Sequence, residues 1–340
     1  MNNKSKCRVV GKQHDLYKVK IETEIRDAKV KGSFIYNAQT ASDFPCVGDW
    51  VNAFIYDDII LIDEIIDRKT HISRKVAGST TEEQIIAANI DYVAIVLGLD
   101  GGRNYSDRLL ERYMTVAWDS GATPLVILNK ADLNDKAEFF KLQAETIAPG
   151  VEIIITSAED GTGIDEILDY FSNGKVGAFI GPSGVGKSAL TNMLLNKEIQ
   201  KTGANRDDDK RGRHTTSSAR MFELSSGGFI IDSPGLREIQ LWADEDDLDN
   251  VFEEISSLAK DCKFTNCQHQ GEPGCAVQAA LESGEITTER YNSYLNLKKE
   301  IAFLNIKKSE KRVFLERQQS KEFTKYCKGI MKEKASMKRS

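Results

Sequence analysis

The residues most able to do chemistry form one glycine-rich stretch near the middle of the chain. Gly181-Pro182-Ser183-Gly184-Val185-Gly186-Lys187-Ser188 fits the pattern G-x-x-x-x-G-K-[ST] in full. Apolar runs over 176–180 and 189–195 flank it, as expected for a strand, a tight loop and a helix. Backbone N–H groups of such a loop wrap phosphates, and the helix N-terminus adds partial positive charge. The pattern predicts that Lys187 reaches the β- and γ-phosphates of a nucleotide and that Ser188 binds Mg²⁺.

Two further motifs indicate that the base of this nucleotide is guanine. Asn129-Lys130-Ala131-Asp132 follows an apolar run and matches the N-K-x-D element of guanine-specific GTPases. Asp132 can accept hydrogen bonds from N1–H and the 2-amino group of guanine, whereas adenine would leave the carboxylate unpaired. We expect Asn129 to tie this loop to the phosphate loop and the stem of Lys130 to pack on the purine face. Ser157-Ala158, after another strand-like run, resembles the companion element whose backbone N–H reads the guanine O6.

Two elements that respond to the γ-phosphate are predicted after the phosphate loop. Asp232-Ser233-Pro234-Gly235 fits D-x-x-G and follows a strand-like run. We expect Asp232 to hold Mg²⁺ through water and the N–H of Gly235 to sense the γ-phosphate. Upstream, a polar stretch over 212–216 ends in two threonines, of which Thr216 is our candidate for closing on Mg²⁺ as the first switch.

The residues that would assist hydrolysis are less well marked. Leu236 occupies the place where Ras-like proteins have a water-orienting Gln, so hydrolysis is expected to be slow unless a partner completes the site. His214 is the nearest candidate to help, in a loop that must order first. A structural or RNA-facing role for His214 is the alternative.

The order of these motifs is unusual, because the base-reading elements at 129 and 157 precede the phosphate loop at 181. The sheet is therefore predicted to be circularly permuted. In this arrangement the chain leaves the second switch and passes directly into the C-terminal segment. We hypothesise that residues 236–239 transmit the state of the γ-phosphate to that segment.

A cluster of metal-binding residue types lies within that segment. Three of the six cysteines and one of the four histidines fall within 14 residues, at Cys262, Cys267, His269 and Cys275. Three thiolates and one imidazole match the ligand set of a structural zinc site, which leaves no open position for chemistry. A disulfide pair or free thiols is the alternative, which a reducing compartment disfavours.

The elements that must position these residues fall into three predicted domains. Residues 1–68 read as short strands, with alternation from Tyr17 to Glu22 and strand-like runs at 29–34 and 50–65, which indicates a small OB-fold β-barrel. Such a barrel either binds oligonucleotides or acts as a spacer. Residues 69–238 are predicted to form an α/β phosphate-loop GTPase domain.

The GTPase domain is expected to open with a helix, and the chain to end in a helical domain. The pair Thr80 and Glu83 suggests a capping box for a helix over 81–89. Strands and helices alternate from there onward, with a further helix at 107–118. Residues 239–340 are predicted to form a helical zinc-binding domain with a basic tail.

Composition and charge limit the classes of protein to which the chain can belong. The chain has 340 residues with 40% hydrophobic and 29% charged residues and 6 prolines, which excludes a largely disordered or fibrous protein. It has no apolar run of ~20 residues and no apolar signal-peptide core, so we expect a soluble, cytoplasmic chain without membrane contact. Residues 296–340 carry a net charge of +9 and the remainder −15. A basic end on an acidic body indicates either nucleic-acid binding or a solvated charged helix.

With these motifs in this order, the sequence resembles the circularly permuted, ribosome small-subunit-dependent GTPases of the RsgA type. The resemblance rests on the barrel pattern, N-K-A-D before G-P-S-G-V-G-K-S, R-H-T-T, D-S-P-G and the Cys/Cys/His/Cys cluster. It implies an OB-fold domain, a zinc-containing C-terminal domain and GTP hydrolysis stimulated by the 30S subunit. The GTP contacts of the family carry over to residues 129–132 and to the loop from Gly181 to Ala189, and its zinc ligands to the cluster.

The resemblance also implies partners and a cellular role. The implied partners are GTP and GDP, the 30S subunit and its 16S rRNA. The implied role is in late maturation of that subunit, with GTP hydrolysis driving release of the protein from it. Nothing in the sequence suggests an obligate oligomer, and we expect a monomer. The alternative is a GTP-gated RNA-binding module for which hydrolysis is incidental. A metabolic kinase is disfavoured, because it has no use for N-K-A-D together with D-S-P-G.

Overall fold

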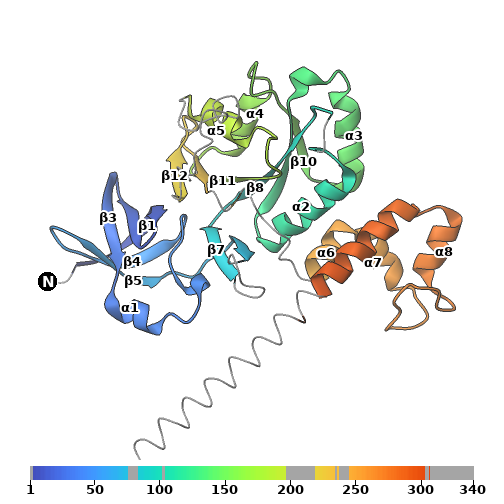
Figure 1. The fold of residues 1–340 in the computed structure, drawn as a ribbon, viewed down its shortest axis with the longest axis horizontal. Helices are drawn as coiled ribbons and strands as arrows, with labels where there is room; N and C mark the ends of the chain where they lie inside the picture. Colours follow the sequence, from blue (N-terminus) through green and yellow to red (C-terminus); the bar gives the residue numbers. More distant parts are fainter. Residues whose placement is uncertain are drawn as a thin grey trace, which may run out of the picture.

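The computed structural model describes residues 3–75, 83–101, 104–196, 219–233, 236, 245–302 and 306. Three structural units follow one another along the chain, and Figure 1 shows the N-terminal strands in blue, the central sheet in cyan to yellow and the C-terminal helices in orange. None of the helices in the described part has the length and apolar character that a bilayer span requires.

The N-terminal unit is a closed five-stranded barrel. Its strands are β1 (Asn3–Gln13), β2 (Leu16–Ile21), β3 (Glu24–Val30), β4 (Trp50–Ile55) and β5 (Ile60–Ile65), with α1 (Gly32–Asn37) and η1 (Ala41–Asp43) after β3. The strand order is β1-β2-β3-β5-β4, and β4 pairs again with β1, so no strand of the barrel is left as an open edge within it. All pairs are antiparallel except β3–β5. The barrel expected from the alternating pattern is confirmed, although the strand expected over 29–34 ends at Val30 and α1 begins at Gly32.

The central unit is a six-stranded, mainly parallel sheet with the order β10-β9-β8-β11-β13-β12. Its strands are β8 (Tyr92–Gly98), β9 (Thr123–Asn129), β10 (Glu152–Ile155), β11 (Val176–Ile180), β12 (Ala219–Glu223) and β13 (Phe229–Asp232). Strands β8, β9 and β11 are almost continuously buried because helices cover both faces, whereas the edge strand β12 is not buried. The covering helices are α2 (Asp107–Asp119), α3 (Ala137–Ile147), α4 (Ile164–Tyr170) and α5 (Lys187–Leu195), and η2 (Ala131–Leu133) follows β9.

The sequence prediction was wrong at the entrance to this sheet. The segment 83–88, expected as part of a helix over 81–89, forms strand β7 (Glu83–Ala88), which pairs antiparallel with β6 (His71–Lys75). Residues 81–82 lie outside the described residues. Ala87 and Ala88 are fully buried in the strand, so pairing and burial override a helix-start signal that is purely local.

The barrel and the central sheet are hydrogen-bonded to each other through their strands. The end of β1 pairs antiparallel with β12, placing Gly11 opposite Arg220 and Lys12 opposite Ala219. An ion pair from Lys20 on β2 to Glu223 on β12, at 2.9 Å, lies beside this junction. The result is one continuous sheet of eleven strands that spans two units of the chain.

The C-terminal unit consists of short helices that share a hydrophobic core with one face of the central sheet. They are α6 (Glu245–Val251), α7 (Glu253–Ala259) and α8 (Ala276–Ser283), followed by helical residues 288–302. Phe252 and Ile301 are both fully buried and belong to the same core cluster as Leu110 and Met114 of α2. Packing against α2 therefore joins this unit to the central sheet.

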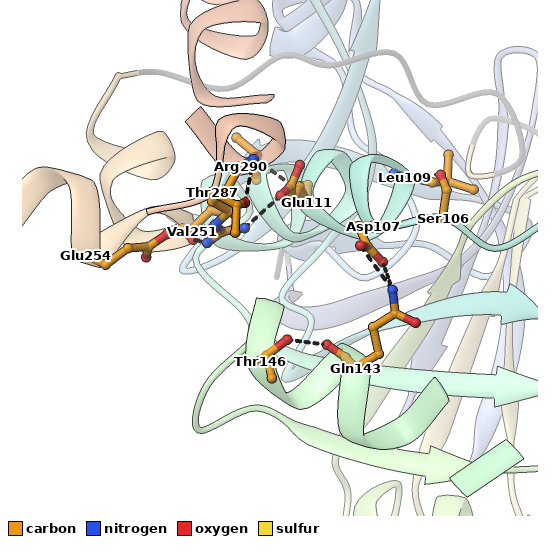
Figure 2. A network of polar contacts seen from close by, with 11 residues as sticks. Ser106, Asp107, Leu109, Glu111, Gln143, Thr146, Val251, Glu254, Thr287 and Arg290 are labelled. Atoms are coloured by element: carbon orange, nitrogen blue, oxygen red, sulfur yellow. Dashed lines mark hydrogen bonds and ion pairs between the residues drawn. The ribbon is translucent and has the colours of Figure 1, made fainter. Parts of the chain in front are cut away.

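A buried ion pair lies at the centre of that contact (Figure 2). Arg290 points toward α2 and donates from Nη1 to Glu111 Oε1 at 2.7 Å, with side chains only 16% and 3% exposed. The same guanidinium pairs with Glu254, donates to the carbonyl of Val251 and lies 4.2 Å from the ring centroid of Phe252. Burial holds the pKa of Glu111 above its usual value, although Arg290 acts in the opposite direction.

Candidate functional site

The glycine-rich loop takes the form expected of a phosphate-binding loop. It links the carboxyl end of β11 to the N-terminus of α5. The ammonium of Lys187 donates to the carbonyls of Gly181 and Pro182, at 2.6 Å each, so the lysine closes back over the loop. Gly181 has φ +138, and a Cβ there would lie 2.2 Å from the carbonyl oxygen of Val96. Only glycine fits this close approach of two parallel strands.

The remaining predicted residues of the loop lie between Pro182 and the first turn of α5; they are Ser183, Gly184, Val185, Gly186, Ser188 and Ala189. Gly186 is the N-cap of α5, with φ +99. The first backbone N–H groups of that helix have no intrahelical acceptor and are available to an anion.

One side chain joins the base-reading motif to the phosphate loop. Asn129 is 1% exposed, and its Nδ2 donates to the carbonyl of Val185 at 2.8 Å, the contact expected from the motif. Its Oδ1 accepts from Thr156 Oγ1 at 3.1 Å and from the N–H of Ala158 at 3.3 Å. Asn129 therefore links three segments that are far apart in the sequence, which are the N-K-A-D loop, the 156–158 segment and the phosphate loop.

The remainder of the base-reading motif is held in a defined backbone conformation. Lys130 has φ +67, and the N–H of Ala131 donates to the carbonyl of Thr156 at 3.0 Å. Asp132 is exposed, and its Oδ1 accepts from the hydroxyl of the fully buried Ser157 at 2.8 Å. One carboxylate oxygen is thus oriented by the 156–158 segment, and this arrangement aims the acidic group that would read a base edge.

The D-x-x-G motif begins at the same edge of the sheet as the phosphate loop. Strand β13 runs parallel to β11, with Ile231 opposite Ala178. Asp232, the next residue, therefore lies near the carboxyl end of β11, where the phosphate loop begins. Leu236 is 2% exposed and belongs to the core, so its side chain does not face the nucleotide site. His214, Thr216 and Gly235 lie outside the described residues.

The four predicted metal ligands converge. Their ligand atoms all lie within 4.8 Å of one another. The Sγ atoms of Cys262 and Cys275 are 3.8 Å apart, and His269 Nδ1 lies 3.6 Å from the first and 3.5 Å from the second. Two thiolates bound to one tetrahedral Zn²⁺ at about 2.3 Å stand about 3.8 Å apart, so the spacing of these three ligand atoms fits such an ion.

The surroundings of the cluster orient its histidine. The hydroxyl of Tyr291 and the side-chain amide of Gln278 both donate to the carbonyl of His269, and Cys275 is the N-cap of α8. Burial lowers the pKa of His269, which keeps the imidazole neutral, the form that binds a metal. The group could therefore hold a metal ion.

Comparisons with known proteins agree with this geometry. A family model described as RsgA GTPase matches residues 65–242. The chain is 41% identical to the small ribosomal subunit biogenesis GTPase RsgA 1 of Oceanobacillus iheyensis, over 94% of this chain and 91% of that protein. It is 42% identical to RsgA 2 of Lactiplantibacillus plantarum, over 87% and 83% of the two chains. The chain belongs to the RsgA GTPase family.

Solved structures support the same assignment for the fold. The crystal structure of YjeQ from Thermotoga maritima, 26% identical, has a TM-score of 0.66 and is matched over 88% of this chain and 99% of that one. YloQ, titled a circularly permuted GTPase, has a TM-score of 0.63 at 24% identity, over 88% and 96% of the two chains. The permuted order is also visible here. The strands β8, β9 and β10, which carry the base-reading motifs, come before β11 in the chain, and in the sheet all three lie on one side of this strand that leads into the phosphate loop.

Two features of this RsgA-family chain were not found from its sequence. Asp100, just after β8, pairs with the ammonium of Lys130 at 2.6 Å. Glu111 and Arg290, 179 residues apart, form the buried pair between α2 and the C-terminal helices. An acidic residue at the carboxyl end of a buried strand was a usable signal for Asp100, since ligands of such sheets bind there. No local signal marks Glu111 or Arg290.

Proposed function

We propose that this RsgA-family GTPase binds guanine nucleotides at the site described above and acts in maturation of the small ribosomal subunit. The observation that carries the proposal is the Asn129 side chain, which fixes the base-reading loop on the phosphate loop. A site for phosphate alone has no need of that link. The curated relatives are named for small-subunit biogenesis, which supplies the setting.

Each part of the nucleotide has a matching group. Asp132 accepts from the base edge, and the N–H of Ala158 lies in the segment expected to meet O6. Lys187 and the loop N–H groups neutralise the phosphates. Ser188 and Asp232, with Thr216, offer hard oxygen ligands of the kind that Mg²⁺ prefers. Bound Mg²⁺ would neutralise charge that develops on the phosphates.

Hydrolysis by the isolated chain is expected to be slow. The side chain of Leu236 is buried in the core and is apolar, so it cannot orient a water molecule. His214 is the candidate to assist once the small subunit is bound. We propose that subunit binding completes the catalytic arrangement and that hydrolysis then drives release.

The other two units supply contacts and stability. In the C-terminal unit, Zn²⁺ held by the Cys/Cys/His/Cys cluster would act structurally, because four protein ligands leave no open position. On the barrel, the exposed Lys6 lies 4.6 Å from the ring centroid of Trp50, and this aromatic and cationic pair is suited to contact 16S rRNA. Arg8, which is half-buried and donates to the carbonyl of Asn89, lies 5.0 Å from the same ring. We propose that the chain works as a cytoplasmic monomer.

The test is GTP turnover by the protein alone, with 30S subunits and with 50S subunits, at two salt concentrations. We expect stimulation by 30S subunits that weakens as salt rises, because rRNA binding releases counterions. Equal turnover in all three mixtures would contradict the ribosomal assignment. That result would not test whether the site binds guanine nucleotides, and a second experiment does so.

That experiment is Asp132→Asn with two nucleotides. An amide in place of the carboxylate can no longer accept from both N1–H and the 2-amino group of guanine but can donate to the 2-oxo group of xanthine. We expect weaker GDP binding and stronger xanthosine diphosphate binding.

A Ser188→Ala protein tests the alternative role. If it still supports subunit maturation, the chain acts as a placeholder and hydrolysis is incidental.

A further inference from the structure

An ion pair lines the base side of the nucleotide site. Lys130 Nζ lies 2.6 Å from Asp100 Oδ2, with side chains 25% and 20% exposed. Asn104 Nδ2 donates to both oxygens of the same carboxylate, at 3.1 and 2.9 Å. The carboxylate is therefore oriented from one side by an amide and is presented to the lysine on the other.

Both ends of this pair are attached to rigid backbone. The N–H of Leu99 donates to the carbonyl of Asn129 at 2.8 Å, and Asn134 Nδ2 donates to the carbonyl of Leu99 at 2.9 Å. These bonds connect the chain after β8 to the chain after β9. Lys130 itself is held at φ +67 between two anchored neighbours, so the freedom left to it lies in its side-chain torsions.

The ion pair removes that freedom. An exposed lysine side chain samples many rotamers, and ordering it opposes binding by about 0.5–1.5 kcal/mol. A lysine whose ammonium is already held by Asp100 has its four-carbon stem extended before a nucleotide arrives. The stem then forms a ready apolar surface beside the base edge that Asp132 reads.

We propose that Asp100 is a positioning residue for the nucleotide, which acts by holding the stem of Lys130 against the purine face. This inference rests on the proposed function, because it concerns the same site. It separates two tasks within the site. Asp132 selects the base by its edge, whereas the Asp100–Lys130 pair stabilises any purine by its face.

The experiment measures the affinity of four proteins for fluorescent GDP and IDP. These are the wild type, Asp100→Asn, Lys130→Met and the double variant; methionine keeps an apolar stem but lacks the ammonium. We expect Asp100→Asn to weaken binding of both nucleotides about fivefold, the loss that corresponds to ordering one long side chain. IDP lacks the 2-amino group, so an unchanged GDP-to-IDP ratio shows that the edge is still read.

The double variant decides whether the lysine carries the effect. In the Lys130→Met background, Asp100→Asn should cause no further loss. The matched control is Asp27→Asn, which breaks the exposed pair with Lys18 on the barrel and should leave affinity unchanged. Thermal melting of each variant reports separately on folding.

Several outcomes would overturn the inference. One is an unchanged nucleotide affinity in Asp100→Asn. Another is an equal loss of affinity on Asp100→Asn in the wild-type and Lys130→Met backgrounds, and the third is a changed ratio of GDP to IDP affinity. If the wild type fails to bind GDP, the proposed function itself fails. The first three outcomes leave that function standing, so the two failures are distinguishable.

Discussion

Replacing Arg290 by Met should open the contact between the central unit and the C-terminal helices. The substitution keeps the stem over the ring of Phe252 but leaves Glu111, whose side chain is 3% exposed, without its opposite charge. Removing one member of a buried ion pair costs about 3–5 kcal/mol. Because Arg290 is itself 16% exposed, we take the lower end, about 3 kcal/mol, which raises the population of the opened state by about 150-fold.

The assay is native-state hydrogen exchange of the amides in α7 and in residues 288–302, which reports the free energy of local opening. A matched control joins the same two helices as the pair of Glu111 and Arg290, which are α2 and the helical residues 288–302. Arg112 pairs with Glu300, but both side chains are 38% exposed, so Arg112→Met should cost less than about 1 kcal/mol.

The pH dependence provides an independent check on the cause. Burial already holds the pKa of Glu111 above its usual value, and loss of Arg290 raises it further. A carboxyl with a raised pKa in the folded state stabilises that state less as pH rises through this pKa. The loss in Arg290→Met should therefore be larger at pH 8, where the carboxyl is ionised, than at pH 4.5, the usual pKa of a glutamate. A loss below 1 kcal/mol, or one equal to that of the control at both pH values, would refute the reasoning.

Three further predictions concern separate parts of the chain. Gly186→Ala places a Cβ 2.3 Å from the amide of the bridging asparagine, whereas Gly184→Ala meets nothing within 4 Å at a similar φ. Fluorescent GDP binding should therefore weaken at least about tenfold more in the first variant, and equal losses would contradict the bridging role. Cys267→Ser should lower the zinc content well below one ion per chain by elemental analysis, and unchanged content would argue against the site. Asp49→Asn leaves the guanidinium of Arg68 without the buried carboxylate that it contacts twice at 2.8 Å. The barrel should lose about 3 kcal/mol in urea unfolding, and a loss below 1 kcal/mol would contradict this.

Short motifs carried most of what the sequence could predict. The loop from Gly181 to Ser188 and the N-K-A-D motif each need neighbouring residues at fixed spacing, so their chemistry is visible without a structure. The candidate metal site is similar, because its four cysteine and histidine residues fall within 14 residues. The permuted order was also readable, since it is a property of motif sequence alone.

Long-range pairing explains what the sequence could not predict. Strand β7 carries a local helix-start signal, and its partner β6 decides its conformation. Asp100 and Lys130 are 30 residues apart, and Glu111 and Arg290 are 179 apart. Charged residues at such separations read as ordinary surface until the fold brings them together. The contact of β1 with β12 belongs to the same class.

That contact makes the barrel part of the sheet rather than a module on a linker. Strand β12 would otherwise be an exposed edge, open to pairing with another chain, and β1 covers its first two residues, Ala219 and Arg220. Its other neighbour, β13, ends at Asp232. Two strand spacings, about 10 Å, separate β1 from β13. A force applied to the barrel would therefore reach, through the backbone pairs of Gly11 with Arg220 and Lys12 with Ala219, the strand next to the one that carries Asp232.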